Sequence, residues 1–228
     1  MNDERMGEHM EPLAFSDGTV FTERKRIYTI SAAPGTRVYG ERTPVVNGVE
    51  YREWNPMRSK LAAYIANGGT KVPMKKNGHV LYLGASSGTT SSHVSDIVSE
   101  GKVYCVEFAP RMFRDLVRNC EPRPNMIPIL ADATKPSEYE FMVSDIDTVY
   151  QDVAQKNQSD ILADNMDKFN ARFGMVAIKA RSEDVAEDPD TVFQHSLKRL
   201  TDRGFTIIDK RRLEPYEDSH MMIVVERR

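Results

Sequence analysis

From His79 to the C-terminus, short apolar runs alternate with amphipathic stretches along the chain. The apolar runs have the length and composition of buried strands, at residues 79–85, 102–108, 126–131, 147–152, 174–180, 205–213 and 220–226. The stretches between them place apolar residues at helical spacing, at 89–99, 110–120, 158–173 and 189–203. This alternation predicts an α/β fold with a seven-stranded, mostly parallel sheet covered by helices on both faces. Only "EPYEDSH" joins the last two strands, so we expect a final hairpin with one antiparallel edge strand.

Residues 1–55 have a different pattern, which is typical of a small antiparallel β domain. The stretch 20–30 alternates like a strand, and 43–54 holds Asn47-Gly48 between two β-type runs. Asn-Gly readily adopts the positive φ angles of a type I′ turn, so 43–54 is predicted to be a hairpin. We therefore predict two domains, at residues 1–55 and 56–228.

A helix is expected where the second domain begins, in "NPMRSKLAAYIANG". Asn55 can cap this helix, and Pro56 suits its first turn. Asn67 and the two glycines after it are predicted to end the helix. Apolar side chains recur between these limits at helical spacing, at Met57, Leu61, Tyr64 and Ile65.

Composition and charge narrow the class of protein. The chain has 228 residues, of which 40% are hydrophobic and 29% charged, enough for one α/β domain with a small addition. The formal net charge of −3 argues against holding bare nucleic acid by charge alone. A nucleic-acid substrate would need local basic patches or partner proteins.

No apolar run approaches the roughly 20 residues that span a bilayer. The N-terminus "MNDERMGEHMEP" is charged and lacks the apolar region of a signal peptide. We expect an intracellular, cytoplasmic protein with no membrane partner. Cys105 and Cys120 are the only cysteines, too few for a zinc site or a disulfide framework, and no metal is expected. Cys105 lies in an apolar strand and is predicted to be a buried thiol.

The first strand of the second domain runs into a glycine-containing loop, "GASSGTTSS". A P-loop would need a lysine after its second glycine, but Thr89 and Thr90 follow Gly88 here. A dinucleotide fingerprint would need a glycine where Ser86 stands, so that the backbone can approach a pyrophosphate. S-adenosylmethionine (SAM) has no phosphate, and small residues with hydroxyls and amides suit its adenosine and its amino-acid tail.

Acidic residues end three successive strands of the predicted sheet. Glu107 lies 19 residues beyond Gly88, close to the spacing of a ribose-hydroxyl acceptor, and Phe108 beside it can lie against adenine. Asp132 can accept from an adenine amine, and Asp152 points to the same crevice. Any one of these acids could instead cap a helix, but together with the loop they favour SAM. The predicted SAM-binding residues are Gly84, Ser86, Gly88, Thr89, Thr90, Glu107, Phe108, Asp132, Ala133, Asp152, Val153, Ala154 and Gln155.

Several strings of the sequence together resemble the archaeal form of fibrillarin: "REWNPMRSKLAAYI", "GASSGTTSSHVSDIV", "YCVEFAPR", "ADATKP", "VYQDVAQ" and "VAIKARS". The resemblance covers nearly the whole chain. Ser87, Ser91 and Ser219 depart from the pattern of the family, the first two in the loop and the third before His220. The chain has no Gly/Arg-rich tail of the kind that eukaryotic members carry, which favours the archaeal form.

The resemblance implies a Rossmann-like SAM-dependent methyltransferase fold and a defined activity. It implies guide-RNA-directed methylation of ribose 2′-hydroxyls in rRNA and tRNA, with SAM as methyl donor, within a box C/D ribonucleoprotein. The implied partners are the box C/D guide RNA, the target RNA, a Nop-type scaffold protein and a kink-turn-binding protein of ribosomal type. Binding to bare RNA is expected to be weak, because the guide and the scaffold would supply sequence choice and placement.

Four residues match the K-D-K-H pattern of related ribose methyltransferases: Lys60, Asp152, Lys179 and His220. A ribose hydroxyl is a poor nucleophile that must lose its proton during attack, so a positioned base or acceptor is needed. Lys179, after the apolar run "GMVAI", is the preferred base or hydroxyl-orienting group. Asp152 would orient Lys179 and hold the methyl-bearing end of SAM, and His220 would complete the hydrogen bonds. Whether Lys179 or Asp152 is the effective base stays open.

Two other functions are compatible with this fold. A small-molecule O-methyltransferase would need an apolar, aromatic-rich lid, but residues 181–190 read "RSEDVAEDPD". A non-catalytic scaffold subunit would not need the lysine and aspartate set. Of the remaining residues, His93 is predicted to pack or cap, His195 to lie on the surface, and Arg58 with Lys60 to lie where substrate phosphates could bind.

Overall fold

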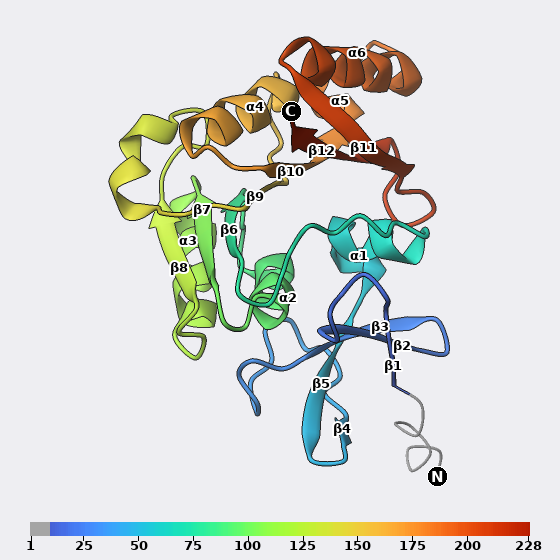
Figure 1. The fold of residues 1–228 in the computed structure, drawn as a ribbon, viewed down its shortest axis with the longest axis vertical. Helices are drawn as coiled ribbons and strands as arrows, with labels where there is room; N and C mark the ends of the chain where they lie inside the picture. The colour runs from blue at the N-terminus through green and yellow to red at the C-terminus, as the bar shows by residue number, and fades with distance from the viewer. Residues whose placement is uncertain (1–9) are drawn as a thin grey trace.

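The computed structural model describes residues 10–228, which form two β-sheets connected by a short helix (Figure 1). The first sheet is antiparallel, as predicted for the N-terminal part, with strand order β1-β2-β3-β5-β4. Its strands are β1 (Glu11–Pro12), β2 (Val20–Glu23), β3 (Arg26–Ile30), β4 (Val45–Val46) and β5 (Val49–Trp54). Residues 1–9, on which the signal-segment prediction largely depends, lie outside the described part.

Tight turns shape the first sheet, and the sequence revealed only one of them. Asn47 and Gly48 have φ angles of 50° and 81°, which confirms the predicted hairpin. The stretch 20–30, however, is two strands rather than one. Arg24 and Lys25 also adopt positive φ, at 48° and 67°, and form a two-residue turn without glycine or asparagine.

The predicted helix between the sheets begins later than expected. Asn55 caps only a 3-10 turn, η1 (Pro56–Arg58), by accepting from the amide of Met57. Ser59 is extended and caps α1 (Lys60–Ala66), because its hydroxyl accepts from the amide of Ala62. Met57 is therefore not part of the helix, and it is 61% exposed rather than buried. The predicted end is confirmed, with Asn67 as C-cap and Gly68 at a φ of 82°.

The second sheet has seven strands in the order β11-β12-β10-β9-β6-β7-β8. Strands β8, β7, β6, β9 and β10 are parallel, and β12 pairs antiparallel with both of its neighbours. The strands are β6 (His79–Leu83), β7 (Lys102–Glu107), β8 (Met126–Leu130), β9 (Thr148–Gln151), β10 (Phe173–Lys179), β11 (Phe205–Arg212) and β12 (His220–Arg227).

The final hairpin is confirmed, and the edge strand pairs antiparallel with its neighbour, as expected. The last strand, β12, inserts between β10 and β11, so the edge strand is β11. Burial explains this order. Met221 to Val225 in β12 are buried, whereas β11 ends in exposed charged residues from Lys210 to Arg212. A strand that is apolar on both faces is more stable inside a sheet than at its edge.

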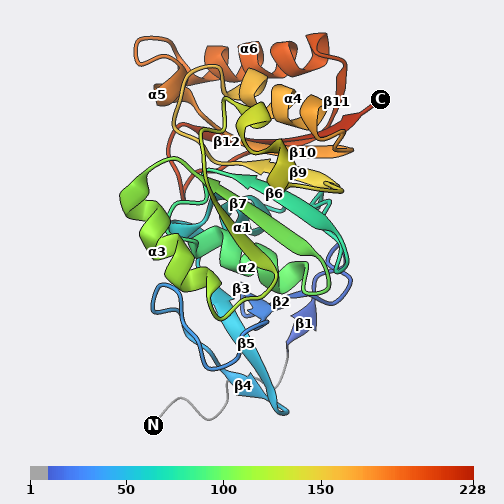
Figure 2. The same cartoon turned by 90° about the vertical axis from the view of Figure 1, so that its left-hand side faces the viewer.

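Helices cover both faces of the second sheet, with α4, α5 and α6 on one side and α1, α2 and α3 on the other (Figure 2). The predicted helix 158–173 is too long: α4 ends at Lys168, and Asn170 takes a positive φ of 50° before β10 begins. Three short elements were not predicted, namely α5, η2 and η3. The elements are α2 (Thr89–Ile97), α3 (Pro110–Cys120), α4 (Gln158–Lys168), α5 (Ala180–Glu183), α6 (Pro189–Asp202), η2 (Pro136–Glu138) and η3 (Glu140–Met142).

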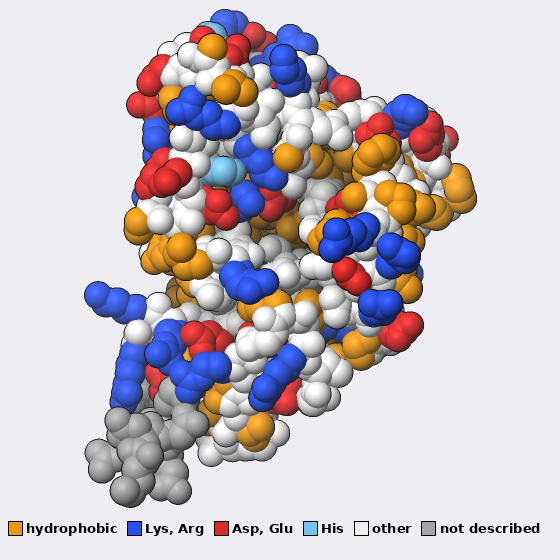
Figure 3. Space-filling view, turned by 180° about the vertical axis from the view of Figure 1, so that it is seen from behind, with side chains coloured by type: hydrophobic (Ala, Val, Ile, Leu, Met, Phe, Trp, Pro, Cys, Tyr) orange, Lys and Arg blue, Asp and Glu red, His pale blue; other side chains and the backbone are white. Residues whose placement is uncertain are grey.

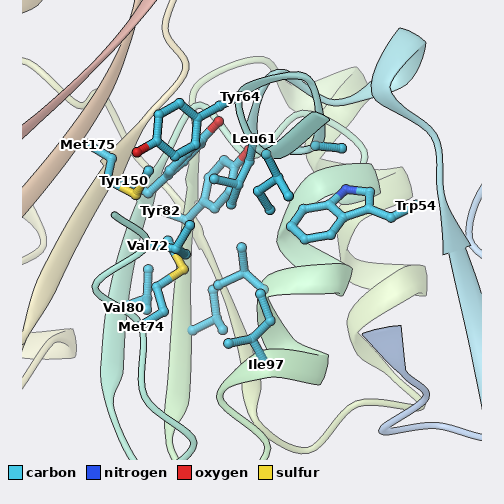
Figure 4. Close-up of a cluster of buried hydrophobic side chains, with 14 of the residues drawn as sticks. Trp54, Leu61, Tyr64, Val72, Met74, Val80, Tyr82, Ile97, Tyr150 and Met175 are labelled. Carbon is cyan, nitrogen blue, oxygen red and sulfur yellow. The ribbon is translucent and has the colours of Figure 1, made fainter. Parts of the chain in front are cut away.

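Alternation along the central strands divides the core into two layers. In β6, Val80 and Tyr82 pack on the side of α1 and α2, whereas Leu81 and Leu83 pack on the side of α4 and α6. The first layer also takes in Trp54 from the N-terminal sheet (Figure 4). Because the two sheets share this core, the division into domains 1–55 and 56–228 stays a prediction.

The junction between the two sheets also contains a buried ion network, which we call the junction cluster: Glu41, Arg52, His93, Asp96 and Arg123. Asp96 accepts hydrogen bonds from Arg52 at 2.7 Å and from Arg123 at 2.6 Å. Arg52 also donates to Glu41 at 2.8 Å. The cluster joins the N-terminal sheet to α2, the helix that follows the glycine-containing loop.

His93 is a packing residue, as predicted. It is fully buried and stacks on Trp54 with 4.9 Å between ring centroids and 14° between ring planes. Burial, reinforced by the charges of Arg52 and Arg123, holds the pKa of His93 well below its usual value. The ring therefore stays neutral inside the cluster.

The predictions of a buried thiol at Cys105 and of an exposed side chain at His195 also hold. Cys105 and Cys120 are free and buried, and burial raises the pKa of the Cys105 thiol well above its usual value. The side chain of His195 is 68% exposed on α6. Within residues 10–228, no helix combines the length and the apolar character needed to cross a membrane.

Candidate active site

The site lies where the chain order of the second sheet reverses. From β6 the chain continues outward through β7 and β8, then returns to β9 on the other side of β6. Side chains that follow β6 and β9 therefore meet at the carboxyl edge of the sheet, where open α/β folds bind ligands. The amide of Asp152 donates to the carbonyl of Leu83 at 2.9 Å, which brings the two strand ends together.

The loop after β6 depends on its two glycines. Gly84 has a φ of 81°, and a Cβ there would lie 2.7 Å from the carbonyl oxygen of Asp152, so no other residue fits. Gly88 has a φ of 100° and begins α2 without any side-chain cap. The first-turn amides of α2 are thus open to an anion, and an amino-acid carboxylate is suitable.

Glu107, at the end of β7, is held in place by the backbone. Its two carboxylate oxygens accept from the amides of Ser86 at 2.7 Å and Ala109 at 2.8 Å. Each oxygen keeps a further lone pair, so the carboxylate can still accept from ribose hydroxyls. Phe108 beside it is 66% exposed, which is unusual for a large apolar ring and leaves a face for adenine to cover.

Asp132 follows β8 at the same edge. Its Oδ1 accepts from the amide and the hydroxyl of Thr134, at 2.9 and 2.8 Å. Its Oδ2 makes no hydrogen bond within the part of the chain that the structure describes, and is available to a ligand. Ala133 and Val153 are buried beside the two strand ends.

Thr90, by contrast, already uses its hydroxyl. The side chain is buried and donates to the hydroxyl of Ser59 at 3.0 Å, which connects α2 to the cap of α1. Only its amide remains for a ligand. The predicted contact of Thr90 with SAM therefore stays a prediction for the backbone alone.

The three predicted catalytic residues Lys60, Asp152 and Lys179 come together. Lys179 Nζ lies 2.8 Å from Asp152 Oδ1, and Lys60 Nζ lies 3.3 Å from Asp152 Oδ2. Lys60 also lies 3.7 Å from Glu217 Oε1. Each of the three side chains is 16% exposed, enough to meet a substrate from the crevice. We call Lys60, Asp152, Lys179 and Glu217 the site cluster.

The fourth predicted residue, His220, lies next to this cluster without joining its hydrogen bonds. It pairs with Lys179 across β10 and β12, so the two side chains lie on the same face of the sheet. Its Nδ1 lies 2.7 Å from the carbonyl oxygen of Asp218, which makes Nδ1 the donor and leaves Nε2 free to accept. Ser219, the departure noted in the sequence, adopts a φ of 57° just before it.

The face behind that of Figure 1 is hollowed at mid-height, and basic side chains lie on both sides of the hollow among acidic ones (Figure 3). On this face, the described basic side chains do not form a continuous field. Among residues 10–228, no His, Cys, Asp and Glu side chains are grouped so that they could hold a metal ion.

Comparison with known families identifies this arrangement. The family model described as Fibrillarin matches residues 16–228. The chain belongs to the fibrillarin family. A relative from Methanopyrus kandleri, named fibrillarin-like rRNA/tRNA 2′-O-methyltransferase, is 51% identical over 215 residues, or 93% of this chain and 90% of the relative.

Solved structures of fibrillarins have the same fold. The Aeropyrum pernix fibrillarin, in complex with natively bound S-adenosyl-L-methionine, superposes with a TM-score of 0.86 at 42% identity, covering 95% of this chain and 97% of that one. A fibrillarin in complex with Nop5p superposes with a TM-score of 0.85 at 40% identity, covering 92% and 98%. The predicted family and the predicted Rossmann-like methyltransferase fold are therefore confirmed.

The fibrillarin fold also brings in residues that the sequence did not reveal. Gln158, fully buried at the start of α4, accepts from the amide of Lys179 at 2.9 Å and donates to its carbonyl at 3.2 Å. It holds the backbone of Lys179 as a neighbouring strand would. Glu217 approaches Lys60 from the loop before β12. Neither had a sequence signal, since a glutamine at a helix start and an acid in a polar loop are ordinary.

Proposed function

We propose that this chain transfers a methyl group from SAM to ribose 2′-hydroxyls of rRNA and tRNA, as the catalytic subunit of a box C/D ribonucleoprotein. The observation that carries the proposal is Asp152, held between Lys60 and Lys179 beside a glycine-containing loop at the switch point of the sheet. The Methanopyrus relative has the same activity in its name, and the Aeropyrum relative binds SAM.

The carboxyl edge of the sheet offers a donor site of suitable chemistry. Gly84 and Gly88 let the backbone approach the ligand, and the open amides of α2 suit its carboxylate. Glu107 suits the ribose hydroxyls, and Phe108 with Asp132 suits the adenine. The segment that follows β9 at this edge of the sheet contains Val153, Ala154 and Gln155. SAM, when bound, supplies a methyl group that is already activated for displacement.

The site cluster acts on the acceptor. The Lys179 ammonium donates to the carbonyl oxygen of Asp152 at 3.2 Å and forms an ion pair with its Oδ1 at 2.8 Å. The ammonium has three hydrogens, so it can also donate to the ribose oxygen. That contact orients the hydroxyl toward the methyl group, and alignment supplies much of the rate enhancement. The hydroxyl proton passes to the carboxylate of Asp152, because the ammonium of Lys179 has no lone pair to accept it. His220 Nε2 can accept a further hydrogen bond on the same face.

Partners complete the substrate site in this proposal. A net charge of −3 and separated basic patches support weak binding to bare RNA, so a guide RNA would place the target. The fibrillarin structure with Nop5p supports a Nop-type scaffold as the docking partner. A kink-turn-binding protein of ribosomal type would hold the guide in the same particle.

The test is Lys179→Ala in the assembled guide complex, with Lys198→Ala as matched control because Lys198 is an exposed lysine on α6. Methylation of a guide-complementary RNA should fall about 10²–10⁴-fold for Lys179→Ala, with SAM affinity within a few fold of wild type. A 2′-deoxy nucleotide at the target position should abolish methylation by the wild type.

Three outcomes would count against the proposal. Equal rates for Lys179→Ala and wild type would remove Lys179 from the reaction. Methylation of a catechol but not of RNA by the wild type would indicate a small-molecule methyltransferase. Absence of transfer to either substrate, with SAM bound, would indicate a scaffold subunit.

A further inference from the structure

Arg58 is an exposed cation that lies over an aromatic ring. Its guanidinium lies 5.4 Å from the ring centroid of Tyr39, and within residues 10–228 it forms no salt bridge. The ring beneath it is well anchored. The Tyr39 hydroxyl lies 2.9 Å from the carbonyl oxygen of Glu53 and 2.7 Å from His93 Nε2. The arginine is thus held on a rigid support while its donors remain free.

The backbone places Arg58 beside the acceptor site. Ser59, between Arg58 and Lys60, is extended, with φ −152° and ψ 117°. Its side chain is buried and bonded to Ala62 and Thr90, so it points into the molecule. Arg58, which is exposed, and Lys60, which reaches Asp152, flank this buried serine, so their Cα atoms are at most about 7 Å apart. That span is comparable to one nucleotide of single-stranded RNA.

The pocket next to Arg58 suits an anion despite the acids near it. It has a volume of about 300 Å³ and includes Asn55, Arg42 and the carboxylates Glu41 and Glu53. Glu41 is already bound by Arg52, and Glu53 lies 3.9 Å from both Arg26 and Arg42. Glu41 is thus paired through hydrogen bonds, whereas Glu53 has only these longer ion pairs and its Oε2 accepts no hydrogen bond within residues 10–228. The guanidinium of Arg58 remains available to a ligand at this pocket. A planar guanidinium binds a phosphate through two parallel hydrogen bonds.

We propose that Arg58, supported on Tyr39, binds the backbone phosphate adjacent to the nucleotide whose ribose lies at Lys60 and Lys179. The proposal rests on the proposed function and adds a subsite to it. Arg58 is then a positioning residue, since it holds the RNA rather than the reacting atoms. It sets the register of the target strand by one phosphate contact, while the guide supplies the sequence.

The experiment compares wild type with Arg58→Ala and Arg58→Lys in the assembled guide complex. Arg118→Ala is the matched control, because Arg118 is an exposed arginine at the far end of α3, toward the amino edge of the sheet. The target RNA carries a neutral methylphosphonate at one position at a time around the methylated nucleotide. The readouts are kcat/KM for the RNA, its dependence on salt, and SAM affinity by calorimetry.

With unmodified RNA, Arg58→Ala should lower kcat/KM about five- to twentyfold through KM, with SAM affinity unchanged. Arg58→Lys should recover part of this loss, because it keeps the charge without the planar fork. The salt slope should fall by about 0.7, as for one phosphate contact on a single strand. At one flanking position the methylphosphonate should abolish the difference between wild type and Arg58→Ala.

Other outcomes would overturn the proposal. If every methylphosphonate lowers wild type and Arg58→Ala equally, Arg58 touches no phosphate. If Arg58→Ala fails to join the scaffold on size-exclusion chromatography, the residue binds an acidic group of the partner protein instead. If wild type methylates no RNA at all, the proposed function fails, and that result is distinct from equal activity of wild type and variant.

Discussion

The junction cluster and the site cluster have the same charge arrangement, an aspartate between two cations. Asp96 lies between Arg52 and Arg123, and Asp152 lies between Lys60 and Lys179. They differ in burial. The side chains of Asp96 and its two arginines are 0% exposed, whereas each member of the second trio is 16% exposed. The same charges can therefore serve stability in one place and chemistry in another.

The choice of cation separates the two clusters further. Arginine is always protonated and binds carboxylates through a fixed fork, so the two cations of the junction cluster cannot exchange protons. Asp96 also accepts from the Thr29 hydroxyl at 2.7 Å and from the Ala32 amide at 2.9 Å, which satisfies its lone pairs. Lysine is a compact charge on a flexible stem, and the site cluster opens to the crevice. The site cluster can therefore bind a substrate group that enters the crevice.

Removing the central carboxylate of the junction cluster should have the largest effect on stability. Asp96→Ala leaves Arg52 and Arg123 buried beside each other without their shared partner, and should lower the free energy of unfolding by about 3–5 kcal/mol. Urea unfolding can be followed by the fluorescence of Trp54, the only tryptophan, which stacks on His93 in the same cluster.

The matched control is Asp115→Ala, which removes an exposed i,i+3 pair with Arg118 on α3. Its effect should stay within about 0.5 kcal/mol. A loss for Asp96→Ala as small as that of the control would show that the buried arginines do not depend on Asp96.

Removing the central carboxylate of the site cluster should have little effect on stability and a large effect on methyl transfer. Asp152→Asn should change the free energy of unfolding by less than about 1 kcal/mol, since both lysines can reach solvent. Methyl transfer should nevertheless fall about 10²–10⁴-fold. The neutral amide of asparagine has no charge with which to orient Lys179, and it cannot take up the proton of the ribose hydroxyl. Urea unfolding and single-turnover methylation on the same preparation measure both. A large loss of stability with normal transfer would reverse the roles assigned to the two clusters.

A third prediction concerns pH and is smaller. Since the folded protein holds the pKa of His93 below its unfolded value of about 6.5, the unfolded state binds the proton first as pH falls. Stability should therefore decrease below about pH 6.5, by up to about 1.4 kcal/mol per pH unit. His93→Gln should flatten this slope, and His195→Gln, an exposed control, should leave it unchanged. An unchanged slope in His93→Gln would assign the pH dependence to other groups.

The carboxylate of the same cluster titrates in a separate window. Burial alone would raise the pKa of Glu41, but the Tyr39 amide and Arg52 together hold it below its usual value. Its stabilising contribution is thus present above about pH 4.3 and lost as pH falls further. Between about pH 5 and 6.5, we therefore expect His93 to cause the decrease of stability with falling pH.

The sequence predicted those features of the structure that depend on residues close together in the chain. The alternation in β6 indicated its two buried faces, Asn47-Gly48 indicated a hairpin, and the strand-end positions of Asp152 and Lys179 indicated a shared edge. Their contact at 2.8 Å follows from parallel strands ending together.

What the sequence could not show depends on distant neighbours. Arg52, in "VEYREW", reads as a solvent-facing residue of a strand, yet it is fully buried because Asp96, 44 positions away, neutralises it. Gln158 holds Lys179 only because α4 starts at that strand end. The insertion of β12 beside β10 is also a long-range pairing, although its continuous apolar run was a readable sign of a central strand.

Substitution of Asp132 should have the smallest effect of these changes. The role of Asp132 differs from those of Asp96 and Asp152, because we expect it to bind the cofactor. One of its oxygens is held by Thr134, as in a loop cap, and the other is open at the carboxyl edge of the sheet. If that oxygen accepts from the adenine amine, Asp132→Ala should weaken SAM binding about three- to tenfold in calorimetry, the worth of one hydrogen bond. Thr134→Ala loosens the carboxylate without removing it and should weaken binding less. Unchanged affinity in Asp132→Ala would leave the residue as a loop cap, a structural role like that of Asp96 but at the surface, and adenine recognition would then rest on Phe108 alone.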